Sequence, residues 1–178
     1  MSLTLPNFFA ELDDCSKSVP LDLLTHHLAK LEISLDDIRK HLQFGVNTYK
    51  RNLIHEGPGY QALVLCWRCG QRSPIHDHRG SNCGVRVLSG VATETFFEQT
   101  EDGWIYATGS RDLGESQVFG SQDTDIHQVS NLRPRGENLV TLHVYSPALL
   151  VMGTYSLTDA TRGQFTDPVY AFVDGAGI

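Results

Sequence analysis

Apolar residues change their spacing near residue 42 of the chain. Before that point they recur at helical intervals, and each run follows a residue type that commonly starts a helix. Pro6 opens NFFAELDD, Pro20 opens LDLLTHHLAKL, and Ser34 precedes LDDIRKHL. The pattern predicts a helical N-terminal segment over about residues 1–42.

From Val46 onward the apolar residues form short continuous or alternating runs that are typical of strands. Gly, Pro, Asn and Asp separate these runs, which are YKRNLI, ALVLCW, VRVLSGVATETFF, WIYAT, SQVFG, IHQVS, LVTLHVYS and VMGTYSL. Many short, evenly spaced strands favour a barrel or sandwich, and a double-sheet jelly roll commonly leaves a ligand cavity between its sheets. We therefore expect an all-β fold with the helical segment packed on it.

The composition limits the classes of partner. A length of 178 residues with 40% apolar side chains fits one domain spanning 1–178. The formal charge of -7 disfavours nucleic acid, because the chain would be repelled by a phosphate backbone. No stretch approaches the apolar length of a membrane span, and the N-terminus lacks the pattern of a signal peptide. We expect a cytoplasmic, monomeric protein with reduced thiols.

Cys66 and Cys69 form a CxxC, a pattern that can hold zinc or act as a redox dithiol. The surrounding ALVLCWRCG is typical of a strand, where residues three apart point to opposite faces. No second CxxC is present to complete a zinc site. The sequence favours one core thiol and one surface thiol.

His76 and His78 stand two apart in a segment with the character of a strand or strand end. Residues i and i+2 of a strand share a face, so both imidazoles can meet one metal ion while Asp77 points away. A pair of surface histidines near a turn is the alternative, because most histidines bind no metal.

The spacing around this pair is G-x5-H-x-H-x4-C-x6-G from Gly70 to Gly90. It resembles the first cupin motif, with Cys83 at the usual glutamate position. The segment from His127 to Asn131 resembles the H-x3-N end of the second cupin motif. The resemblance implies a third imidazole, that of His127, opposite the first two inside a cupin barrel.

A metal held by three imidazoles and no carboxylate keeps its full charge and about three open coordination positions. Open positions favour catalysis over a purely structural role. Cys83 is itself a possible soft ligand, which would favour zinc or copper, and spacing alone leaves that choice open.

Seven short stretches, including those around the two motifs, make the chain similar to the cysteine dioxygenases, the thiol dioxygenase branch of the cupins. They are YKRN (49–52), CW (66–67), IHDH with Ser81 and Cys83, VLSG (87–90), ETFF (94–97), IHQVSN (126–131) and LHVYSP (142–147). The resemblance implies Fe(II) on His76, His78 and His127. It also implies an enzyme of cysteine catabolism whose partners are O2 and a small thiol, L-cysteine, oxidised to cysteine sulfinic acid.

The same resemblance assigns substrate binding to Arg51, whose guanidinium suits a carboxylate, with Tyr49 assisting from the same strand face. Without the histidines, a surface charge and a strand aromatic would be the simpler interpretation.

Tyr145 matches the family's active-site tyrosine, and Cys83 matches the cysteine that can join that ring through a thioether bond. His143 matches a histidine that orients the tyrosine hydroxyl. Thr141 stands where the family typically has serine and retains the hydroxyl that would hold His143. The family's bond corresponding to Ser146-Pro147 is cis.

Three alternatives stay open. A 3-mercaptopropionate dioxygenase resembles this family but typically has glutamine at the position of Arg51. A non-catalytic cupin that binds a metal or ligand is the rival from another class, because a fold does not determine a function. A zinc-dependent cupin isomerase is disfavoured by the absence of the glutamate ligand.

Overall fold

The computed structural model describes residues 3–15, 18–123, 125–166 and 168–171. Two helices lie near the start, α1 (Leu5–Asp13) and α2 (Leu21–Lys30), followed by a 3-10 turn at Arg39–His41. The strands are β1 (Leu3–Thr4), β2 (Leu31–Glu32), β3 (Lys50–Gly57), β4 (Tyr60–Trp67), β5 (Ile75–His76), β6 (Asn82–Ser89), β7 (Ala92–Gln99), β8 (Ile105–Leu113), β9 (Val118–Ser121), β10 (Ile126–Ser130), β11 (Leu139–Ser146), β12 (Met152–Tyr155), β13 (Arg162–Phe165) and β14 (Val169–Ala171). None of the helices in these described ranges is long and apolar enough to cross a membrane.

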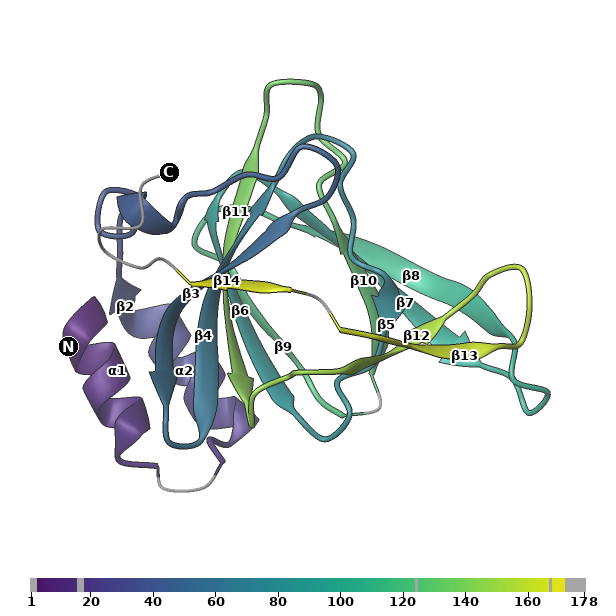
Figure 1. The fold of residues 1–178 in the computed structure, drawn as a ribbon, viewed down its shortest axis with the longest axis horizontal. Helices are drawn as coiled ribbons and strands as arrows, with labels where there is room; N and C mark the ends of the chain where they lie inside the picture. The colour runs from purple at the N-terminus through teal and green to yellow at the C-terminus, as the bar shows by residue number, and fades with distance from the viewer. Residues whose placement is uncertain (1–2, 16–17, 124, 167, 172–178) are drawn as a thin grey trace.

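The strands form two six-stranded sheets and a two-stranded ribbon (Figure 1). One sheet has the order β13-β12-β5-β10-β7-β8, the other has the order β14-β3-β4-β11-β6-β9, and β1 pairs with β2. The predicted all-β, double-sheet fold is confirmed. The predicted run 85–97 is divided at Gly90, where a φ of +84° lets the chain turn from β6 in one sheet to β7 in the other. The short strands β1, β2, β13 and β14 were not predicted, whereas β5 lies in the segment predicted as a strand or strand end.

The central strands β4 and β11 are buried along their whole length. Alternate side chains of β11 have different neighbours, as the strand period of two requires. Leu142 and Val144 pack against the helices, whereas Leu139 and Tyr145 belong to the core between the sheets. This sheet therefore separates two cores, and only the inner one is available for a site.

Helices α1 and α2 cover the outer face of that sheet (Figure 1). Apolar residues on their inner faces, including Phe8, Leu24 and Leu28, are fully buried. Gly84 on β6 permits the close approach of α2, because a Cβ there would lie 2.8 Å from the Cδ1 atom of Leu28. The two helices thus pack on the outer face of the barrel.

The predicted helix after Ser34 is wrong. Its first bonds do form, since the backbone N–H of Ser34 donates to the carboxylate of Asp37 over 2.8 Å. At Ile38, however, φ is -117°, which leaves the helical region, and only a 3-10 turn follows. Leu35, Ile38 and Leu42 still pack against the helical core. The apolar residues of this segment are therefore buried by tertiary packing, although the backbone around them does not form a regular helix.

Candidate metal centre and the cavity around it

Three imidazoles converge between the two sheets. His76 lies on β5, His78 follows in the next loop, and His127 lies on β10 directly opposite His76 in the strand pairing. One nitrogen from each ring lies within 4.8 Å of the others, and all three residues are buried. Within the described ranges, no other three His, Cys, Asp or Glu side chains come together in this way. The structure brings together the histidines predicted from the spacing.

Two of the imidazoles are oriented by bonds from Nδ1. His76 Nδ1 lies 2.9 Å from the backbone carbonyl oxygen of Pro74, and His127 Nδ1 lies 2.8 Å from the carboxylate of Glu94. A carbonyl oxygen can only accept a hydrogen bond, so His76 carries its hydrogen on Nδ1 and presents Nε2 as a lone pair. The same arrangement at His127 leaves its Nε2 for a ligand.

His78 has two buried ring nitrogens with no hydrogen-bond partner among the described residues. Burial of a polar group without a partner is costly, and such groups in native proteins usually bind a ligand, an ion or water. Three imidazoles with open nitrogens are a donor set suited to a first-row divalent metal. The residues present therefore fit a metal ion.

Burial keeps the imidazoles of His76 and His78 neutral. It lowers the pKa of His76 to about 3, assisted by the neighbouring His127. Burial, and then the nearby His127 and His76, also hold the pKa of His78 well below its usual range. A neutral imidazole has the lone pair that metal coordination needs, so no proton has to leave these two rings at neutral pH.

The acid between the paired histidines points elsewhere, as expected. The carboxylate of Asp77 accepts hydrogen bonds from the backbone N–H of Gly153 at 3.0 Å and from the hydroxyl of Tyr155 at 2.7 Å. These bonds fasten the loop after β5 to β12. They hold His78 in place although it lies outside the strand.

The other predicted site residues line one small buried cavity with the three histidines. The cavity residues are Tyr49, Arg51, Leu65, Trp67, Ser73, His76, His78, Cys83, His127, Val129, His143, Tyr145 and Met152. None of these lining residues, all within the described chain, is acidic. The buried guanidinium of Arg51 thus gives the cavity a positive charge that favours an anionic ligand.

Arg51 is held at one side of this cavity. Its Nη2 donates to the backbone carbonyl oxygen of Leu149 over 3.3 Å. Its guanidinium carbon lies 5.4 Å from the centre of the Tyr145 ring, within cation–π range. Tyr49 stacks on Trp67 with ring centroids 4.1 Å apart.

A row of hydrogen bonds runs along the inner face of β11. The hydroxyl oxygen of Thr141 lies 2.9 Å from His143 Nε2, and His143 Nδ1 lies 3.1 Å from the hydroxyl oxygen of Tyr145. Burial, and then the charge of Arg51, hold the pKa of His143 well below its usual range. The Ser146-Pro147 bond is cis, as the resemblance implied.

Cys83 on β6 is the direct cross-strand partner of Tyr145. Its sulfur lies 4.0 Å from His143 Nδ1, and burial raises the pKa of the thiol above its usual range. The other cysteines agree with the sequence analysis, because Cys66 is buried on the outer face and Cys69 is exposed.

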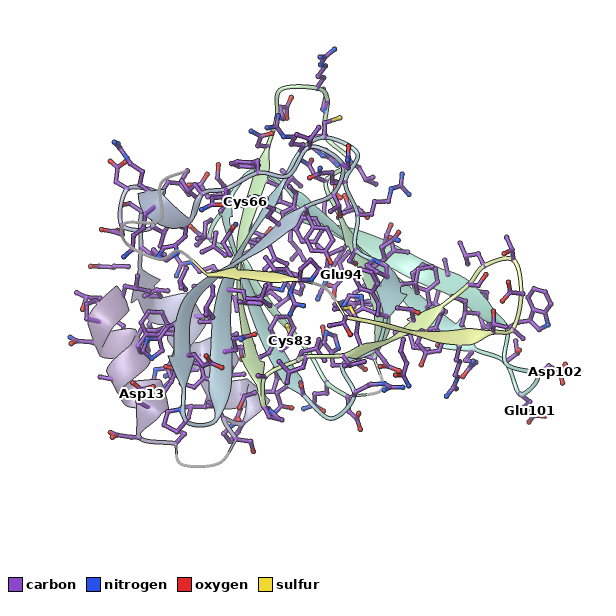
Figure 2. All side chains as sticks on the ribbon, in the orientation of Figure 1. Asp13, Cys66, Cys83, Glu94, Glu101 and Asp102 are labelled. Carbon is purple, nitrogen blue, oxygen red and sulfur yellow. The ribbon has the colours of Figure 1, made fainter. Side chains whose placement is uncertain are left out.

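Glu94 is a polar residue of the centre that the sequence analysis missed. It is 1% exposed, and besides His127 its carboxylate meets Arg111 at 2.7 Å. Figure 2 labels Glu94 and Cys83 in the middle of the molecule and Glu101 and Asp102 at the tip of the β7–β8 hairpin. The signal in the sequence is an acid at an inward position of β7, in line with the buried Ala92.

Two facing sheets with a three-histidine cluster between them define a cupin barrel with a candidate metal centre. A solved protein from Thermus thermophilus is similar to this chain in fold, with a TM-score of 0.50 and 16% identity. The match covers 65% of this chain and 99% of the Thermus protein.

The family model for cysteine dioxygenase type I matches residues 11–158, and the chain belongs to that family. It is 31% identical to cysteine dioxygenase type 1 of Danio rerio over 137 residues, which are 74% of this chain and 68% of the fish protein. It is 35% identical to the Rattus norvegicus protein of the same name over 109 residues. That match covers 59% of this chain and about half, 54%, of the rat protein.

The substitution Glu94→Gln tests whether the Glu94 carboxylate orients His127 for metal binding. We expect it to weaken the binding of a divalent metal by about tenfold to hundredfold, the usual effect of removing a group that orients a ligating histidine. Competition between the protein and a chromophoric chelator for Zn(II) measures the affinity. The matched control is Glu98→Gln, an exposed acid on the same strand. Equal affinities for the wild type and Glu94→Gln would contradict a role for this carboxylate.

Proposed function

We propose that this protein is an iron-dependent dioxygenase that converts L-cysteine and O2 into cysteine sulfinic acid. The observation that carries the proposal is that a buried arginine shares one cavity with the three imidazoles. Membership of the cysteine dioxygenase type I family supports the same reaction. In this proposal His76, His78 and His127 are the metal ligands.

Arg51 would bind the carboxylate of cysteine. A guanidinium offers paired donors and a fixed charge to a planar carboxylate, and burial strengthens that attraction by excluding water. Arg51 is 1% exposed and faces the same cavity as the histidines. A thiol that carries a carboxylate would then lie with one end at Arg51 and its sulfur toward the imidazoles. Tyr49, which directly precedes β3 and also lines the cavity, would form part of its wall.

When bound, Fe(II) supplies the redox chemistry that lets O2 react with a thiolate sulfur. The protein residues would supply position and charge. Both oxygen atoms end on sulfur, and the electrons that sulfur loses are those that O2 gains, so no further reductant is required. Tyr145 and His143, which also line the cavity, would supply hydrogen bonds to the ligand.

Oxygen uptake by the full chain tests the reaction. After anaerobic reconstitution with Fe(II), we expect L-cysteine to cause O2 consumption with an equal amount of cysteine sulfinate detected by mass spectrometry. His127→Ala should lose both metal binding and uptake, and His26→Ala, which changes an exposed histidine, should retain them. Metal removal by a chelator should also stop uptake.

The outcomes of this experiment separate the alternatives. Faster uptake with 3-mercaptopropionate than with cysteine would reassign the substrate. Stoichiometric metal binding without uptake for either thiol would remove the dioxygenase proposal and leave a metal-binding cupin.

Arg51→Ala tests carboxylate recognition. Hydrogen bonds to charged groups contribute about 1.5 to 3 kcal/mol, so kcat/KM for cysteine should fall by about tenfold to hundredfold. Cysteamine lacks the carboxylate, and any rate with it should be unaffected by the substitution. Arg72→Ala, at an exposed arginine, is the matched control. An unchanged kcat/KM for cysteine in Arg51→Ala would remove this residue from the substrate site.

The pairing of Cys83 with Tyr145 favours the thioether bond that the resemblance implied. Its formation removes the thiol hydrogen and one ring hydrogen, with O2 as the oxidant at the iron site. After turnover we expect a fraction of the chain to be lighter by two hydrogens in intact-mass spectra. Cys83→Ser should lose this fraction, and Cys66→Ser, at a buried cysteine facing the helices, should keep it. A single unmodified mass after exhaustive turnover would rule the bond out.

A further inference from the structure

The two oxygen atoms of the Glu94 carboxylate face different partners. The Oε1 atom accepts a hydrogen bond from His127 Nδ1 over 2.8 Å. The Oε2 atom accepts one from Arg111 Nε over 2.8 Å and lies 2.7 Å from Arg111 Nη2. One side of the carboxylate therefore meets a proposed metal ligand, and the other side meets a cation.

Arg111 lies where the edges of the two sheets come together. It is the direct cross-strand partner of Glu94 on β8, the edge strand of its sheet. Its guanidinium carbon lies 5.1 Å from the centre of the Phe96 ring and 5.6 Å from the centre of the Phe119 ring. Phe119 belongs to β9, the edge strand of the other sheet, and both distances are within cation–π range. Groups from both sheets thus hold the guanidinium over the buried carboxylate.

The chain of contacts from Arg111 to His127 has an electrostatic consequence. A carboxylate that accepts from Nδ1–H makes the imidazole a better electron donor to a metal at Nε2. A cation bonded to the other carboxylate oxygen opposes this effect, because it attracts the same negative charge. Glu94 is only 1% exposed, so water screens these interactions little. The charge that acts on His127 therefore depends on Arg111 as well as on Glu94.

We propose that Arg111 is a positioning residue that holds the Glu94 carboxylate against His127 and limits the negative charge that this carboxylate directs to the metal ligand. The proposal rests on the metal ligands of the proposed function and not on the thiol reaction. An ion pair that only joined β7 to β8 would weaken metal binding when it was lost. An ion pair that limits charge strengthens metal binding when Arg111 is lost, whereas loss of Glu94 weakens it.

Competition between the full chain and a chromophoric chelator for Zn(II) separates these two roles. We expect Arg111→Gln to bind Zn(II) about twofold to fivefold more tightly than the wild type, the size expected for the loss of one half-exposed ion pair. Arg111→Lys retains the positive charge and should keep the wild-type affinity. The matched control is Arg133→Gln, which removes a partly exposed arginine from its ion pair with Asp112 and should also leave the affinity unchanged.

Thermal unfolding shows whether each variant is folded. If Arg111→Gln has no cooperative transition, Arg111→Met replaces it, because an unbranched apolar side chain can still pack against Phe96 and Phe119. Unchanged or weaker Zn(II) binding in the folded variant would overturn the proposal. Failure of both variants to fold would also overturn it, because the ion pair would then serve the fold alone.

A double-mutant cycle tests whether Arg111 acts through Glu94. In the Glu94→Gln background the carboxylate charge is absent, so Arg111→Gln should change the Zn(II) affinity by less than about twofold. An equal gain in both backgrounds would show that Arg111 acts on the metal directly through space, and the assignment to Glu94 would be wrong.

The ferric/ferrous reduction potential of the iron-loaded chain reads the same charge in a second way. Negative charge near iron favours the ferric state, and positive charge favours the ferrous state. Arg111→Gln should therefore lower the potential, and Glu94→Gln should raise it. Shifts in the same direction would contradict the proposal. A wild-type chain that binds neither Zn(II) nor Fe(II) would remove the proposed metal centre and this inference with it, whereas metal binding without oxygen uptake would remove only the thiol reaction.

Discussion

Burial of one sheet on both faces is the constraint on which the candidate site depends. Each residue of β4 and β11 is buried, and the period of two sends neighbouring side chains to opposite cores. Leu142 and Val144 contact the helices, and the intervening His143 faces the cavity. The helices stabilise the barrel from outside, so the inner face can carry polar groups at positions that a one-sided sheet would fill with apolar residues. This arrangement separates the stability of the fold from the chemistry of the cavity.

Burial also sets the charge state of the His76 and His78 imidazoles. Desolvation is the largest cause of the lowered pKa at both His76 and His78, and proximity to the other rings adds to it. Two of the rings have partners that determine their orientation, the Pro74 carbonyl oxygen and the Glu94 carboxylate. His78 depends instead on the position of its loop, which Asp77 ties to β12. The same burial that makes His76 and His78 neutral also prevents bulk water from satisfying their open nitrogens.

Much of this arrangement follows from the sequence, and the exceptions have physical reasons. Strand periodicity predicted the main strands. The cupin-like spacing pointed to His76, His78 and His127, which lie together in the structure. The prediction of a helix after Ser34 was wrong. The sequence carries local signals for a first helical turn, but these signals do not show where tertiary packing ends the helix. The sequence indicated a strand or strand end at His76, but it did not reveal the partners of β5, because the pairing with β10 and β12 is non-local.

Glu94 was missed for a different reason. Its partners Arg111 and His127 are 17 and 33 residues away in the chain, and only the folded sheet makes them neighbours. In the sequence it was simply the first residue of a matching ETFF stretch. An acid on a strand is usually solvated, and its burial became evident only when the inner face of β7 was known.

The hydrogen bonds of the cavity share one feature that connects these observations. Some groups in these hydrogen bonds can act in one role only. The backbone carbonyl of Pro74 only accepts, and the indole N–H of Trp67 only donates. Imidazoles and hydroxyls can act either way, so a buried network built only from them would have several arrangements of similar energy. The Pro74 carbonyl selects one arrangement at His76, which presents the Nε2 lone pair inward. The lone pairs of the imidazoles suit a cation on one side of the cavity, and the buried guanidinium of Arg51 suits an anion.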